Sequence, residues 1–76
     1  MNSAELQRWL RDRPFEPFRI VMSDGGVLDV FHPDQIVVLK TLAYVGRCAT
    51  AREVAERDIT ISLLHVVRLE PLRKIG

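Results

Sequence analysis

The stretch FRIVMSDGGVLDVF, residues Phe18–Phe31, predicts a β-hairpin. Side chains alternate between two faces along Phe18–Met22, as they do in a strand that buries one face. Ser23–Gly26 then predicts a tight turn, because glycine adopts the positive φ angles that such turns require. The alternation resumes over Val27–Phe31, which is the expected return strand.

A single helix is expected before the hairpin. Asn2 or Ser3 can cap it, and Asn2 with Glu5 has the spacing of a capping box, which satisfies amide groups left free at a helix start. Apolar side chains recur along it at three- and four-residue steps: Leu6, Trp9 and Leu10. Pro14 ends the helix, since the residue before a proline is pushed out of helical geometry. The apolar stripe needs a surface to cover, so Trp9 is interpreted as a core residue rather than a stacking platform.

Beyond the hairpin the pattern remains that of strands. His32–Asp34 interrupts it as a turn, because proline presets φ and aspartate can bond a nearby amide. Further strands are predicted at Gln35–Leu39, Thr41–Arg47, Asp58–Leu63 and Val66–Leu69. We expect Gln35–Leu39 to be buried on both faces, and the chain to bend at Leu64 and His65.

The segment Cys48–Arg57 is rich in small and charged residues. It is either a long surface loop or a short helical turn, and the loop is favoured.

One helix followed by about five antiparallel strands places the chain in the α+β class. We expect the strands to form a curled sheet or a small SH3/Sm-like barrel, since short strands in this number tend to close and hide their edges. Residues 1–76 are expected to form a single domain.

Size and cysteine content bear on how such a domain is stabilised. A chain of 76 residues buries about 60–65% of the surface that its unfolded form exposes, so its stability should be marginal. Small domains compensate with disulfides, a metal or a partner subunit. Cys48 is the only cysteine and lies far in sequence from His32 and His65, so neither a disulfide nor a ligand-spaced metal pair is indicated. Self-association is the route that remains.

The same composition bears on compartment and partners. A lone thiol fits a reducing compartment, and no apolar run approaches the roughly 20 residues of a membrane helix. Residues 1–5 lack the basic and apolar regions of a signal peptide. We therefore expect a cytoplasmic protein without membrane contact. The net charge of +1 argues against a dedicated DNA-binding domain.

No arrangement for catalysis is indicated. His32 and His65 are the only imidazoles, and the sequence has neither a nucleophile elbow nor a phosphate-binding glycine loop. The carboxylates of Asp24, Asp29 and Asp34 fit turn and surface positions rather than a converging set. Enzyme activity, a cofactor, a metal and a small-molecule substrate are therefore not predicted.

Nearly the whole chain resembles a family of short, uncharacterised bacterial proteins. The resemblance is carried by Arg13–Ile20, Asp24-Gly25, His32–Asp34 and Ser62–Leu72. It implies a compact bacterial domain and implies no activity.

A second resemblance is to Sm-like proteins, which include the bacterial RNA chaperone Hfq. The order of elements is similar, and Asp24-Gly25 with Leu28 resembles the first hairpin of that fold. Leu64–Leu69 is similar to the last two strands of Hfq, where a lysine–histidine pair lines an RNA-binding pore. His65 matches the histidine, and Leu64 takes the lysine position. The resemblance implies RNA binding by basic residues, for which the candidates are His65, Arg68, Arg19 and Arg47.

Two functions follow as hypotheses. The leading one is a non-enzymatic protein-interaction module that self-associates or binds a protein partner, as near-neutral charge, marginal size and exposed strand edges suggest. The alternative is an Sm-like RNA-binding ring. It requires Arg73 and Lys74 to share one face with the four candidates, because phosphate contacts supply most of the affinity for nucleic acid.

Overall fold

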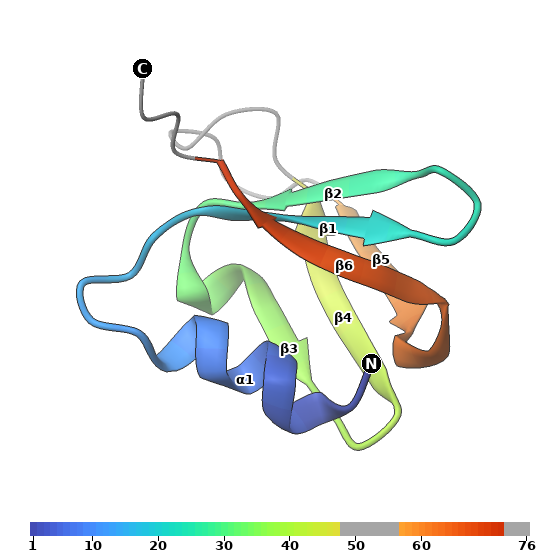
Figure 1. Cartoon of the computed structure of the whole chain (residues 1–76), viewed down its shortest axis with the longest axis horizontal. Coiled ribbons are helices and arrows are strands. Elements are labelled where there is room, and N and C mark those ends of the chain that lie inside the picture. The colour runs from blue at the N-terminus through green and yellow to red at the C-terminus, as the bar shows by residue number, and fades with distance from the viewer. Residues whose placement is uncertain (48–56, 73–76) are drawn as a thin grey trace.

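The computed structural model describes residues 1–47 and 57–72 (Figure 1). Its elements, in chain order, are the helix α1 (Ser3–Arg11), strands β1 (Phe18–Met22) and β2 (Val27–Val30), the short 3-10 helix η1 (Pro33–Gln35), strands β3 (Ile36–Val38), β4 (Leu42–Arg47) and β5 (Arg57–Ser62), the 3-10 helix η2 (Leu63–His65) and strand β6 (Val66–Pro71). The α+β class is confirmed, with six strands in the described residues where about five were expected. Within this part of the chain no helix has the length and apolar character needed to cross a membrane.

The strands form two antiparallel sheets rather than one curled sheet or a closed barrel. Sheet A has the strand order β2-β1-β6, and sheet B has the order β3-β4-β5. The break lies at η1, where Pro33 presets φ and supplies no amide donor. The ladder of β2 therefore stops, and the chain turns to begin β3 in the other sheet. Among the described strands, β2 and β5 each keep one edge without a strand partner, so the expected barrel is not closed.

The predicted hairpin is confirmed as β1 and β2. Its register begins with Phe18 opposite Val30. The turn is closed by a hydrogen bond of 2.8 Å from the amide of Met22 to the carbonyl oxygen of Gly26. Gly25 has a φ of +89°, which glycine adopts without a steric penalty.

The predicted helix is confirmed as α1, which lies alongside β3 (Figure 1). The side chain of Asn2 accepts a hydrogen bond of 2.9 Å from the amide of Glu5, as a capping residue does. Leu6 is fully buried, and Trp9 packs edge-to-face on Phe18 with ring centroids 5.4 Å apart. The largest fully buried side chains come from α1, η2 and both sheets: Phe18, Leu6, Ile20, Leu63, Val30 and Val45. The core therefore lies between the two sheets and α1.

Gln35, at the end of η1, ties the two sheets together. Its Nε2 donates to the carbonyl oxygen of Asp29 in sheet A at 2.8 Å and to that of Gly46 in sheet B at 2.6 Å. Its Oε1 accepts a hydrogen bond of 2.8 Å from the amide of Phe31. One amide group thus serves three main-chain partners where the chain passes from one sheet to the other.

The prediction of a strand at Gln35–Leu39 buried on both faces is wrong in two respects. The strand β3 is shorter, because Gln35 belongs to η1. Val37, in the middle of β3, is 56% exposed, because sheet B has one face on the core and the other in solvent. The expected bend at Leu64 and His65 is confirmed as η2. The predicted loop or helical turn at 48–57 lies outside the described residues except for Arg57, the first residue of β5.

Candidate functional site

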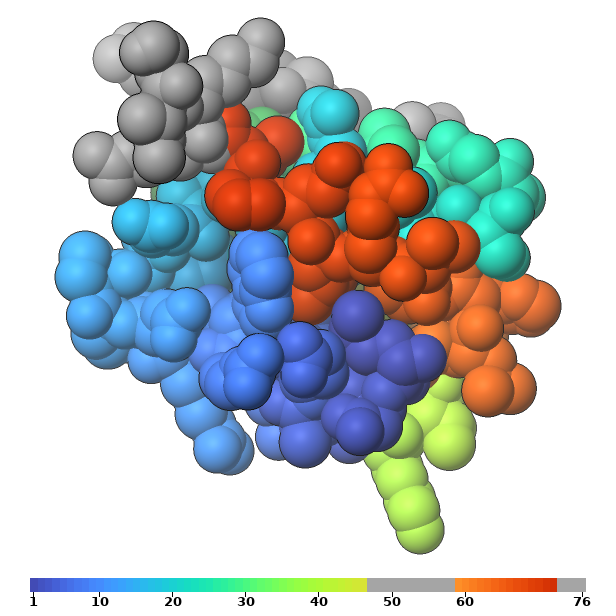
Figure 2. All heavy atoms as spheres, in the orientation of Figure 1, coloured from blue at the N-terminus to red at the C-terminus, as the bar shows by residue number. Residues whose placement is uncertain are grey.

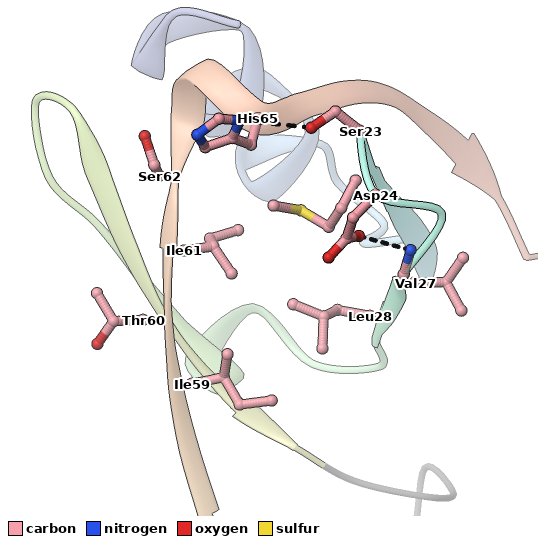
Figure 3. A pocket seen from close by; sticks show the side chains of 11 residues that line it. Ser23, Asp24, Val27, Leu28, Ile59, Thr60, Ile61, Ser62 and His65 are labelled. Carbon is pink, nitrogen blue, oxygen red and sulfur yellow. Dashed lines mark hydrogen bonds between the residues drawn. The ribbon is translucent and has the colours of Figure 1, made fainter.

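A cleft of about 590 Å³ opens between the β1–β2 hairpin and β5 (Figure 3). Its apolar lining comes from Met22 and Leu28 in sheet A and from Ile59 and Ile61 in sheet B. Figure 3 shows the two isoleucines pointing toward Leu28 across the cleft, whereas Thr60 between them points away. Because β2 and β5 are edges of different sheets, no described strand closes the cleft between them.

The rim of the cleft is polar and includes His65. Its Nδ1 lies 3.3 Å from Oγ of Ser23, and its carbonyl oxygen accepts a hydrogen bond of 2.7 Å from the Ser23 amide. Asp24 accepts a hydrogen bond of 2.8 Å from the Gly26 amide through Oδ1. These contacts hold η2 against the hairpin. They do not form a nucleophile–base–orienting set, since the Asp24 carboxylate serves the turn and not the imidazole.

In residues 1–47 and 57–72 there is no group of three His, Cys, Asp or Glu side chains that could hold a metal ion. The cleft offers an apolar floor and a rim of hydrogen-bonding groups.

Arg19 and Arg68, two of the four predicted nucleic-acid-binding residues, share the outer face of sheet A. Arg19 donates from Nε to Oδ1 of Asp29 at 2.8 Å and from Nη2 to Oδ2 at 3.3 Å. This hydrogen bonding and the charge of Asp29 raise the pKa of Arg19 above its usual value. Nε of Arg68 lies 3.3 Å from Oε2 of Glu70. Two cations thus face two carboxylates, and this surface is balanced in charge.

The other two predicted residues lie at opposite ends of sheet B. Arg47 is the last residue of β4, whereas His65 follows the far end of β5. The length of the strand between these ends is roughly 17 Å. The basic residues 73 and 74 lie outside the described residues. The structure therefore brings together two of the four candidates, and the role of all four in binding nucleic acid stays a prediction.

Sheet edges are a second feature of the molecule that bears on binding. Four strands are edges in the described residues, and three have features that discourage pairing. β2 has four residues and β3 has three, with α1 beside β3. β6 crosses the surface between α1 and the hairpin (Figure 2). Its pairing with β1 shifts register between Val21 and Met22, and it carries Arg68 and Glu70 and ends at Pro71.

The fourth edge, β5, has none of these features in its described side chains. It is six residues long and pairs with β4 in an unbroken register. Ile59–Ser62 carry no charge and no proline. Sequence reasoning predicts this strand but not its position at a sheet edge, because alternation does not show which strand has a neighbour on one side only. The uncharged run Ile59–Ser62 is the signal that could have identified it.

Comparisons with protein-family models, with curated proteins and with solved structures found no match. Function is therefore inferred from the geometry of the cleft and of β5.

The outer face of sheet B carries a row of three side chains, one from each strand: Val37, Tyr44 and Thr60. Val37 and Tyr44 are 56% and 43% exposed. Adjacent exposed apolar side chains are more typical of a contact surface than isolated ones are.

Proposed function

We propose that the chain is a small, non-enzymatic, cytoplasmic protein-interaction module that associates with copies of itself. One observation carries the proposal: β5 has a strand partner on one side only among the described residues, and this edge lies beside an apolar cleft. An exposed edge offers a row of main-chain amide and carbonyl groups that pairs readily with another strand. A second strand laid on β5 satisfies those groups and covers the cleft at the same time.

The size of the chain supports association. A domain of 76 residues has a free energy of unfolding of about 4–11 kcal/mol. A partner that binds the folded form alone adds to this by mass action. Cys48, as the only cysteine, gives the chain no intramolecular disulfide and is consistent with a reducing compartment.

An RNA-binding ring is the alternative that the Hfq resemblance implies. Affinity for nucleic acid comes mainly from lysine and arginine contacts to phosphates. On the outer face of sheet A, the charges of Arg19 and Arg68 are balanced by Asp29 and Glu70, so this face offers phosphates no net positive charge. Protein–protein association is therefore the better supported function.

Light scattering coupled to absorbance at a protein and a nucleic-acid wavelength tests this proposal. We expect a mass of two or more chains that rises with protein concentration, and no absorbance from nucleic acid. A strictly monomeric mass at high concentration would contradict the proposal. A hexamer or heptamer that carries RNA removable by a salt wash would establish the ring in its place.

A further inference from the structure

We infer that the strand that pairs with β5 is β5 of a second copy, antiparallel about a two-fold axis through Thr60. The inference rests on the proposed function and specifies its interface. A two-fold axis perpendicular to the sheet makes two identical edge strands antiparallel and lets each contact the other in the same way. The product is one continuous sheet with the strand order β3-β4-β5-β5-β4-β3.

The register follows from which residues face each other. Residues directly opposite in an antiparallel pair point to the same face, so the axis must pass through a residue rather than between two. An axis at Thr60 sets Thr60 opposite itself and Ile59 opposite Ile61 of the second copy. An axis at Ile61 sets Ile59 opposite Leu63, which has left the strand for η2. An axis at Ile59 sets Ile61 opposite Arg57. The axis at Ile61 also sets Ile61 opposite itself and Thr60 opposite Ser62, but it keeps only residues 60–62 of β5 in the pairing. The axis at Thr60 keeps residues 58–62 paired and, unlike the axis at Ile59, sets no charged residue opposite an isoleucine.

The second copy supplies apolar side chains at the open side of the cleft. Ile59 is half-buried and lines the cleft together with Leu28 and Met22. In the inferred register, Ile61 of the second copy comes beside Ile59 on the same face of the sheet. Directly opposite Cβ atoms lie about 4.5–5.5 Å apart, so the two isoleucines are in contact. The contact removes the exposed part of Ile59 from water, whereas Ile61 is already buried in its own copy.

The absence of charge on Ile59–Ser62 favours β5 of a second copy as the strand that pairs with β5. A two-fold contact brings residues near the axis against their own counterparts, so a charged residue there repels itself. Ile59–Ser62 are uncharged, and so are Val37 and Tyr44 in the row that ends at Thr60. Two copies can therefore meet along β5 without opposing like charges in this row.

The variant Thr60→Lys tests the position of the axis. Thr60 is exposed and points away from the cleft, so a lysine is accommodated in the monomer but opposes a second lysine across the axis. We expect the dissociation constant of the dimer to rise about a hundredfold or more. The matched control is Val67→Lys, which places the same charge on an exposed valine of β6, in sheet A. Its dissociation constant should stay at the wild-type value, measured by sedimentation equilibrium, with circular dichroism to verify folding.

A cysteine variant tests the same axis without relying on repulsion. In a Cys48→Ser background, Thr60→Cys sets two thiols directly opposite each other. Opposite Cα atoms lie about 4.5–5.5 Å apart, within the range that a disulfide spans. Mild oxidation should give a covalent dimer, whereas Val67→Cys in the same background should remain uncrosslinked.

The results of these experiments distinguish a failure of the inferred interface from a failure of the proposed function. A monomeric Thr60→Lys, a dimeric Val67→Lys and a cross-linked Thr60→Cys support the inference. A monomeric wild type overturns both the proposed function and the interface. If the wild type associates and Thr60→Cys does not cross-link, or if both lysine variants lose the dimer equally, the function stands and the axis at Thr60 is overturned. Should Thr60→Lys fail to fold, the cross-linking result decides.

Discussion

Replacing Phe18 with alanine is expected to lower the free energy of unfolding by about 3–5 kcal/mol. The ring of Phe18 is fully buried in β1. It packs edge-to-face on Trp9 at 5.4 Å and on Phe15 at 6.1 Å between centroids, so alanine removes two aromatic contacts as well as filled volume. A chain of this size has about 4–11 kcal/mol in total, so the variant loses a large part of its stability, and all of it at the lower end of this range.

Urea unfolding followed by the fluorescence of Trp9, the single tryptophan, measures this loss. The matched control is Phe31→Ala, because Phe31 is half-buried and loses less apolar contact. We expect a loss of about 1 kcal/mol for the control. Similar losses for the two variants would show that the core is not centred on Phe18.

Replacing Gln35 with methionine is expected to lower the free energy of unfolding by about 2–4 kcal/mol. Methionine keeps the length of the side chain but removes the bonds to the carbonyl oxygens of Asp29 and Gly46 and to the amide of Phe31. Leaving a buried polar group without a partner costs about 1–3 kcal/mol, and these three groups are partly buried. The substitution therefore acts at a point where one side chain bonds to the main chain of both sheets.

The control for this variant is Gln7→Met in α1. Gln7 is half-buried on α1, and methionine keeps its length and its helix propensity, so the replacement should change stability by no more than about 0.5 kcal/mol. Both variants can be compared by urea unfolding under identical conditions. Equal stability of the two would mean that the Gln35 bridge contributes little.

Local sequence is enough to predict the helix and the hairpin. The Asn2 cap and the Gly25 turn act on residues next to them in the chain, so their signals are complete within a few positions. The sorting of strands into two sheets depends on pairs far apart in sequence, such as Phe18 with Pro71. The break at His32–Asp34 is visible in the sequence, but its consequence, the transfer of β3 to a second sheet, is not.

The candidate site depends still more on distant pairs. The ion pair between Arg19 and Asp29 follows from the hairpin register, which sets them opposite each other, so it could have been predicted from the sequence. The sequence does not show that β5 is an edge, because this requires knowing that β4 is its one neighbour. The Hfq resemblance implied that basic residues form the binding site, whereas no known motif marks the uncharged run Ile59–Ser62.

The most direct test of self-association through β5 mixes the variants Thr60→Lys and Thr60→Glu. Each variant alone opposes like charges across the axis, whereas a mixed pair sets a lysine opposite a glutamate. Light scattering on the separate and mixed samples measures the outcome. We predict that each variant is monomeric alone and that the equimolar mixture forms a dimer of one chain of each kind. A mixture that stays monomeric beside a dimeric wild type, or single variants that associate as strongly as the wild type, would contradict the account.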